Sequence, residues 1–308
     1  MAEPLSVAVR RGEIVESVHL VHAVAVQAGA VVAEAGDPAL AASLRSAAKP
    51  IQALPLARAC PQLGADELAI AAASHAGTPM HVEAVRLLLA ATGGSEGELD
   101  CGLQEGRPRE PIYHNCSGKH AALIAVCRAH GWPVEGYRLP EHPLQRALLE
   151  EVAGAADLAP DEVQTGPDGC GVVCFALPLE RAAFAFARFE EREGGERIAA
   201  AMRARPDLVG GEGASDTDLM RMLPGWIAKR GAEGLFCAAS PDGLGLALKA
   251  ADGNGRALRA AIAAFGTRLG LRLDRFGEES LHNAHAESVA SIGLLENCFR
   301  SARSRVTS

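Results

Sequence analysis

The chain has 308 residues, of which 48% are hydrophobic and 22% are charged, so it contains enough apolar material for one large core or two fused lobes. Its net charge of -8, without a run of lysine and arginine, argues against nucleic acid as a partner. The apolar stretches are too short to span a membrane, and residues 1–13 lack the apolar segment of a signal peptide. We therefore expect a folded, cytoplasmic protein.

The predicted elements begin with strands and continue with helices. Branched and alternating residues predict strands over residues 5–10, 14–26 and 31–35, with a turn at 27–29. A helical pattern starts at residue 46, tolerates Pro50 in its first turn, and should kink or end at Pro55. Further helices are predicted at residues 81–91, 118–130, 143–153, 179–189, 217–229 and 257–269, and further strands at 235–239, 244–250 and 289–295.

This order of elements predicts an α+β fold. Strands at both chain ends can pair in one antiparallel sheet, packed with helices from the middle of the chain. We expect residues 1–308 to form a single unit, in which a helical lobe of roughly residues 80–230 is inserted between the N- and C-terminal strands.

The basic residues are unevenly divided between lysine and arginine. Only four of the 30 are lysines, namely Lys49, Lys119, Lys229 and Lys249. Arginine serves as well as lysine on a surface, but it cannot lose its proton in a protein. The few lysines are therefore candidates for positions where a neutral amine is needed.

Ser46 and Lys49 form an SxxK motif in RSAAKP, at the predicted helix start. At this spacing the two side chains share one helix face, and a neutral lysine can take the proton of a serine nucleophile. The free N–H groups of a helix start could also stabilise an oxyanion. The alternative is that Ser46 only caps the helix and that Lys49 is solvated.

Two further positions carry polar side chains at the ends of apolar runs. Ser74, in ASHAG, could relay protons or be an ordinary residue at the end of an element, and the neighbouring His75 is better explained as structural. Lys249, in LKAADGN, follows an apolar strand and could lower the pKa of Lys49, or could simply extend from a sheet edge.

A possible metal site involves Cys116, Lys119 and Cys170. Cys116 and Lys119 are spaced to share a helix face in NCSGKH, and Cys170 lies in the tight loop PDGCG. Two thiolates and one neutral amine could bind zinc and leave a fourth position open. The spacing permits a metal without requiring one, since cysteines are often buried apolar residues.

Taken together, six motifs resemble those of the Rhizobium-type L-asparaginase family, also called the asparaginase II or class 3 family: RSAAKP, ASHAG, HNCSGKH, GPDGCG, LVGGEG and LKAADGN. The resemblance extends from Val15 to Gly253, and NCSGKH with DGC is its most specific part. It implies a fold similar to serine β-lactamases and glutaminases, hydrolysis of L-asparagine, and a homodimer.

The resemblance also implies a role for each candidate residue. Ser46 would be the nucleophile with Lys49 as its base, Ser74 and Lys249 would be the supporting pair, and Cys116, Lys119 and Cys170 would hold zinc. The serine would form a β-aspartyl ester that water then hydrolyses. Two positions depart from the family pattern: Ala214 stands where arginine often follows GEG, and Ala76 where a second serine is common.

Three other functions use the same residues differently. A β-lactamase or penicillin-recognising enzyme shares the SxxK motif, and a zinc hydrolase would use metal-bound water as its nucleophile. A non-catalytic, zinc-containing protein could bind an amino acid without turnover. Ammonia release that depends on Ser46 separates the serine asparaginase from the zinc hydrolase and from the non-catalytic protein. Turnover of a β-lactam identifies the β-lactamase.

Overall fold

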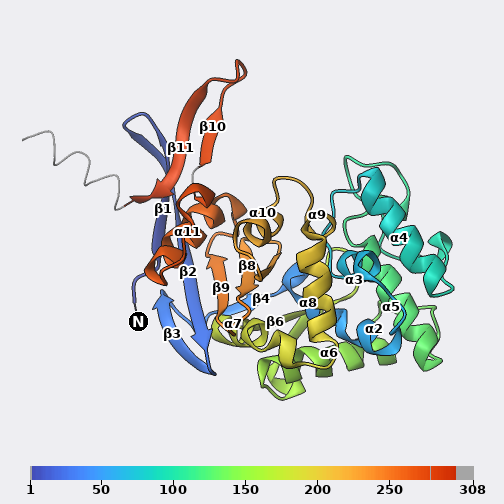
Figure 1. The fold of residues 1–308 in the computed structure, drawn as a ribbon. Coiled ribbons are helices and arrows are strands. Elements are labelled where there is room, and N and C mark those ends of the chain that lie inside the picture. Colours follow the sequence, from blue (N-terminus) through green and yellow to red (C-terminus); the bar gives the residue numbers. More distant parts are fainter. Residues whose placement is uncertain (1, 278, 296–308) are drawn as a thin grey trace, which may run out of the picture.

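The computed structural model describes residues 2–277 and 279–295, and a large antiparallel sheet dominates one side of the fold (Figure 1). Its strand order is β10-β11-β1-β2-β9-β8-β7, with β3 also paired to β2. The strands are β1 Leu5–Arg11, β2 Ile14–Gln27, β3 Ala30–Ala35, β7 Ile227–Arg230, β8 Leu235–Ala239, β9 Gly245–Ala250, β10 Glu279–His282 and β11 Ser288–Leu294.

Strands from the two chain ends meet in this sheet. β1 pairs with β11, and β2 pairs with β9, with Ala23 opposite Leu248. The predicted α+β class, with an antiparallel sheet built from both ends and packed with helices, is therefore confirmed. The proposed division into a sheet and an inserted lobe of residues 80–230 stays a prediction.

Helices fill the space beside the sheet. In Figure 1 most of the central helices lie together on one side of it, while α7 packs against β2 and β9 and α11 against β11. The α-helices are α1 Lys49–Gln52, α2 Leu54–Ala59, α3 Ala65–Ala71, α4 Pro79–Ala91, α5 Ser117–His130, α6 Pro143–Ala156, α7 Leu179–Ala187, α8 Gly195–Ala204, α9 Pro206–Val209, α10 Ser215–Met222 and α11 Leu258–Arg268.

Most predicted helices are present, but the one at 217–229 is wrong in its second half. The helix ends at Met222, and residues 227–230 form the strand β7. Pro224 and Gly225 separate the two elements, and Gly225 has a φ of +86°, a conformation that ends a helix. Lys229 consequently lies on a strand of the main sheet.

Several shorter elements were not predicted. They include α3, α8, α9, β10 and a second sheet of three strands, β4 Ala41–Ser43, β6 Val173–Pro178 and β5 Gln164–Pro167, in that order. These segments are short, or rich in alanine, glycine and proline, so their hydrophobic periodicity is weak.

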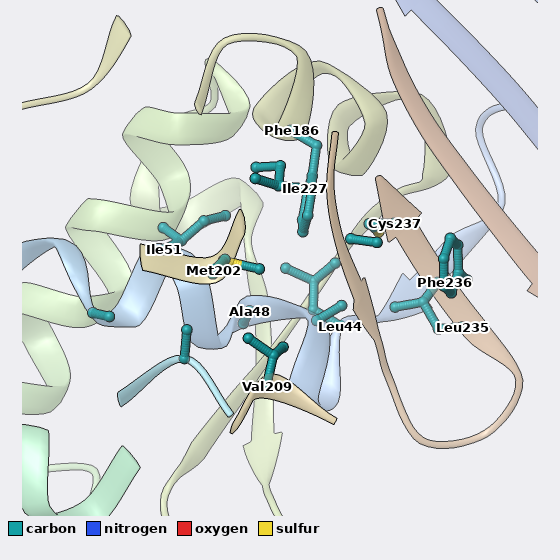
Figure 2. Packing of buried hydrophobic residues seen from close by; sticks show 14 of the residues in the cluster. Leu44, Ala48, Ile51, Phe186, Met202, Val209, Ile227, Leu235, Phe236 and Cys237 are labelled. Carbon is teal, nitrogen blue, oxygen red and sulfur yellow. The ribbon is translucent and has the colours of Figure 1, made fainter. Parts of the chain in front are cut away.

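The segment that carries Lys49 is anchored in the core on both sides of that residue. Ala48 and Ile51 are buried and lie in the cluster of Figure 2, with Val209 and Met202 among their labelled neighbours. Pro55 falls in the first turn of α2, where its missing N–H costs no hydrogen bond, so the predicted interruption occurs at Ala53. Core packing therefore fixes the backbone that presents Lys49.

No helix in residues 2–277 and 279–295 combines the length and the apolar character that crossing a membrane requires.

Candidate active site

Two of the predicted catalytic residues, Ser46 and Ser74, line one cavity of about 540 Å³. This volume lies in the range of about 300–1,000 Å³ that is typical of small-molecule sites. Much of the lining is polar, and it comes from segments far apart in the sequence. The other lining residues are His75, Ala76, Gln104, Arg107, Asn115, Ser215, Arg230, Gly231, Ala232, Glu233, Gly234, Gly253, Gly255 and Leu258.

Ser46 lies in a short 3-10 turn, Arg45–Ala48, that leads directly into α1. Leu44 occupies the cap position of this turn, so Ser46 is not a capping residue. Arg45 has a φ of +45°, a left-handed conformation that is strained for a residue with a side chain. Its guanidinium donates a hydrogen bond of 2.6 Å to Asp168, which helps to hold the strained turn in place.

Lys49 is almost fully buried, with 1% of its surface exposed. Its amine donates to the Ala73 carbonyl at 2.6 Å and to the Ser74 hydroxyl at 3.0 Å, and approaches the Asn115 carbonyl at 3.4 Å. Burial lowers the pKa of Lys49, the negative sulfur of Cys116 opposes this, and the charge of Lys119 lowers the pKa further. The environment thus favours the neutral amine that a base requires.

The structure therefore joins Lys49 to Ser74 by a direct hydrogen bond. Within the described residues no such bond joins Lys49 to the side chain of Ser46, although both serines line the same cavity. The three-residue spacing places Ser46 one turn before Lys49. The amine of Lys49 does not extend along this turn but points inward, to the Ala73 carbonyl after α3 and the Asn115 carbonyl before α5.

His75 has both ring nitrogens engaged. Its Nδ1 accepts the Gly77 N–H at 3.1 Å, so the proton lies on Nε2, which donates to the Ser117 hydroxyl at 2.9 Å. Burial lowers the pKa of His75 well below its ordinary value, and the nearby charges of His81 and Lys49 act in the same direction. A neutral ring with both nitrogens bonded is suited to a structural role.

Lys229, on β7, is a further buried lysine that is electrostatically coupled to Lys49. It is fully buried, and its amine donates to Asp216 at 2.9 Å and to the Arg230 carbonyl at 3.2 Å. Burial lowers the pKa of Lys229 to about 8, against the opposing charge of Asp216, and the charge of Lys49 contributes to the lowering. A second buried amine thus lies within electrostatic range of the first.

Lys249 occupies a different environment. It lies on β9, opposite His22 and Leu235, and its amine donates to the Ala250 carbonyl. Burial lowers its pKa, while the charges of Glu233 and Asp252 raise it. In the part of the chain that the structure describes, none of its hydrogen bonds reaches Ser74 or Lys49, so the expected supporting pair is not brought together.

The three predicted zinc ligands do come together. Lys119 donates to the Cys170 sulfur at 3.0 Å, the charges of Cys116 and Cys170 both act on the pKa of Lys119, and at most 5% of each residue is exposed. The hydrogen bond from Cys170 and the charges of Lys49 and Lys119 lower the pKa of Cys116, although burial opposes them. Asp168 lies 3.6 Å from Lys119.

This donor set is chemically suited to zinc. Two sulfurs and an amine are soft or borderline ligands, and three protein ligands leave a position for a further group. Over residues 2–277 and 279–295 no group of three or more histidine, cysteine, aspartate or glutamate residues could hold a metal. A zinc ion at Cys116 and Cys170 would use the amine of Lys119 as its third protein ligand.

The chain belongs to the L-asparaginase II family, because the model of that family matches residues 7–293. The family that the sequence motifs resembled is thereby confirmed. Membership supports the broader class of an amidohydrolase. No curated protein sequence matches the chain.

Solved structures give weaker similarities. The protein Mglu in its native form is 13% identical with a TM-score of 0.48, and the match covers 82% of this chain and 66% of Mglu. A putative β-lactamase from Bacteroides dorei is 14% identical over 79% and 92% of the two chains, with a TM-score of 0.42. A β-lactamase from Mycobacterium bovis is 16% identical over 80% and 94%, with a TM-score of 0.36.

The chain thus spans just under two thirds of Mglu. Neither the predicted homodimer nor the cytoplasmic location follows from any of these matches, and both stay predictions.

The two departures from the family pattern lie in different places. Ala76 lines the cavity, where a larger side chain would reduce its volume. Ala214 is buried at the start of α10 and does not contribute to the described lining. The cavity-lining charges come instead from Arg107, Arg230 and Glu233, none of which sequence analysis singled out.

The Asp216–Lys229 pair predicts a large effect on stability. Asp216→Asn would leave Lys229 buried without its carboxylate, and we expect the free energy of unfolding to fall by about 3–5 kcal/mol, as measured by urea unfolding. Glu212→Gln, which breaks an exposed pair with Arg221, should change it by less than about 0.5 kcal/mol. Equal effects of the two substitutions would contradict the importance of the buried pair.

Proposed function

We propose that the chain hydrolyses the side-chain amide of L-asparagine to aspartate and ammonia through an acyl-enzyme on Ser46. The Ser46 oxygen attacks the amide carbon, the nitrogen takes up a proton and leaves as ammonia, and a β-aspartyl ester remains. Water then adds to the ester and releases aspartate and the serine hydroxyl. Each cycle consumes one asparagine and one water.

The observation that carries this proposal is the buried amine of Lys49 beside the hydroxyls of one cavity. The amine has a lowered pKa and contacts Ser74 directly, while Ser46 lies one turn earlier in the same wall. A proton from Ser46 can reach Lys49 directly after a side-chain rotation, or through the hydroxyl of Ser74. Contacts of this kind are often longer in the absence of substrate than during reaction.

In this proposal Lys229 replaces Lys249 as the supporting lysine. Lys229 is buried and electrostatically coupled to Lys49, whereas Lys249 is half-buried on β9 near Glu233 and Asp252. Because this coupling is mutual, a positive charge on Lys229 would help to keep Lys49 neutral. Asp216 holds Lys229 in position for this role.

The hydrogen bond between Lys49 and Ser74 also favours a second candidate, in which Ser74 is the nucleophile and Ser46 only lines the cavity. Both versions use the same base and the same acyl-enzyme chemistry. They differ only in the serine that carries the ester.

We further propose that Cys116, Lys119 and Cys170 hold a zinc ion. Bound there, zinc would supply a fixed positive charge and fix the positions of its ligands. Cys116 is the cap residue directly before α5 and follows Asn115, whose carbonyl lies 3.4 Å from the amine of Lys49. The three ligands would therefore stabilise the wall of the cavity that contains Asn115.

Alanine substitutions separate the two serines. We expect Ser46→Ala to abolish ammonia release from L-asparagine, and Ser74→Ala to reduce kcat by about 100-fold or more because a proton relay is lost. Both variants should unfold at the temperature of the wild type. Retained turnover in Ser46→Ala, with none in Ser74→Ala, would assign the nucleophile to Ser74.

Intact protein that binds asparagine but releases no ammonia would instead favour the non-catalytic alternative. Loss of turnover on chelation, together with turnover in both serine variants, would favour a zinc hydrolase. Turnover of a β-lactam in preference to asparagine would favour the β-lactamase.

Lys49→Arg tests the requirement for a neutral amine. Arginine keeps the positive charge but cannot accept a proton from serine, so kcat should fall by about 100-fold or more. Circular dichroism should show an intact fold. Turnover close to that of the wild type would exclude Lys49 as the base, and a comparable loss in Lys249→Arg would restore a role to Lys249.

Zinc content tests the metal site independently of activity. We expect about one zinc per chain by elemental analysis of the purified protein, and a loss of at least about 10-fold in zinc affinity in Cys116→Ser and Cys170→Ser. Cys174→Ser is the matched control, because Cys174 lies four residues from Cys170 and contacts Ser43 instead. Equal zinc content in all three variants would exclude the site.

A further inference from the structure

The cavity carries two charged side chains of opposite sign, Arg107 and Glu233, that form no salt bridge with any described residue. We propose that Arg107 binds the carboxylate attached to the α-carbon of the substrate and that Glu233 binds its ammonium group. The cavity would thereby select amides of zwitterionic amino acids. This assignment rests on the proposed function and deepens it, because it names the groups that orient the amide toward the serines.

The hydrogen-bond partners that hold Arg107 in place are neutral backbone carbonyls. Its guanidinium donates to the Tyr113 carbonyl at 2.7 Å and to the His75 carbonyl at 3.1 Å, which leaves three of its five N–H groups for a ligand. Burial lowers the pKa of Arg107 because a buried charge loses its hydration. An anion bound in the cavity would offset this free-energy cost of burying the guanidinium charge. A guanidinium with free, fixed donors matches the geometry of a carboxylate.

The motif ASHAG makes room for this guanidinium. Gly77 has a φ of +70°, and a Cβ atom at that position would lie 2.9 Å from a nitrogen of Arg107. A residue with a side chain would therefore be strained and would also displace Arg107. Since His75 accepts a hydrogen bond from Arg107 through its carbonyl, the segment that presents Ser74 also positions the arginine.

Arg230, the other cavity-lining arginine, already has an acidic neighbour. It lies 3.7 Å from Asp216, and its backbone N–H also donates to that carboxylate. Arg107 lacks such a neighbour across residues 2–277 and 279–295, so it is better suited to bind an external carboxylate.

Glu233 is exposed to the cavity on a turn between β7 and β8. Its φ is +56°, a strained conformation that glycine would adopt more easily, and strain of this kind is often kept at functional positions. A Cβ atom on Gly253 would lie 2.6 Å from a carboxylate oxygen of Glu233, so the opposite loop is also shaped around it. Within the described chain this carboxylate makes no hydrogen bond and no ion pair, which leaves it free for an ammonium group.

Three amides that differ by one charged group test the assignment. L-asparagine carries both groups, 3-aminopropanamide lacks the carboxylate, and succinamic acid lacks the ammonium group. In Arg107→Gln we expect kcat/KM for asparagine to fall by about 10- to 100-fold, while that for 3-aminopropanamide changes by less than about 3-fold. In Glu233→Gln the preference for asparagine over succinamic acid should fall by a similar factor.

Arg109→Gln is the matched control, because Arg109 is exposed two residues away and does not line the cavity. This substitution should leave kcat/KM unchanged for all three amides. An equal fall for asparagine and 3-aminopropanamide in Arg107→Gln would show that Arg107 acts only on the fold and would overturn its assignment. A loss of discrimination in Arg230→Gln, with none in Arg107→Gln, would move the carboxylate to Arg230.

Binding without turnover separates this inference from the proposed function. In the Ser46→Ala background, titration calorimetry should detect asparagine, and the Arg107→Gln substitution should weaken that binding by about 10-fold or more. If no amide is hydrolysed by the intact protein but this loss of binding occurs, the hydrolase proposal fails and the recognition site remains. If asparagine binds equally well with and without Arg107, the recognition site fails whatever the turnover.

Discussion

The burial of lysine amines is the constraint on which the candidate site depends. Removing an ammonium group from water costs several kcal/mol unless it is paired or loses its proton. Lys49, Lys119 and Lys229 are all buried, and each meets this cost in its own way. Lys119 contacts Cys170 and Asp168, and Lys229 contacts Asp216. Lys49 has no carboxylate partner among the described residues; its amine donates to carbonyl and hydroxyl oxygens, and only the sulfurs of Cys116 and Cys170 favour its charged form. Of the three, Lys49 is therefore the amine whose surroundings most favour the uncharged state.

Backbone strain occurs next to the same cavity. Arg45 and Glu233 both have left-handed conformations without being glycine, and each lies beside or within the cavity lining. Such residues cost of the order of 1–3 kcal/mol each and persist only where the surrounding contacts determine them. The ion pair of Arg45 with Asp168 connects the strained turn before Ser46 to the segment that carries Cys170. The two serines and the sulfur cluster are thus coupled through one hydrogen-bonded framework.

The sequence predicted the local parts of this site better than its long-range contacts. The spacing of NCSGKH predicts that Cys116 and Lys119 lie together at a helix start. In the structure Cys116 is the cap residue of α5 and Lys119 lies in its first turn, where it contacts Cys170. The SxxK spacing indicated a contact between Ser46 and Lys49, but the inward path of the lysine side chain leads to Ser74 on another segment. Periodicity describes which residues share a face, and it does not determine which distant segment will meet that face.

The placement of the supporting lysine shows the same limit. The pattern of residues 217–229 predicts one helix with Lys229 at its end, while the resemblance implies Lys249, which follows an apolar strand, as the supporting lysine. The break at Pro224 and Gly225 instead sends Lys229 into the sheet beside β8, where Cys237 is its neighbour and Asp216 its partner. The scarcity of lysine could have indicated Lys229, since an arginine-rich chain that retains lysine in a strand core has a reason for it. An arginine at position 229 would be larger than lysine and would always be charged. Its effect on the pKa of Lys49 would then be constant, whereas the charge of a lysine can change during a reaction.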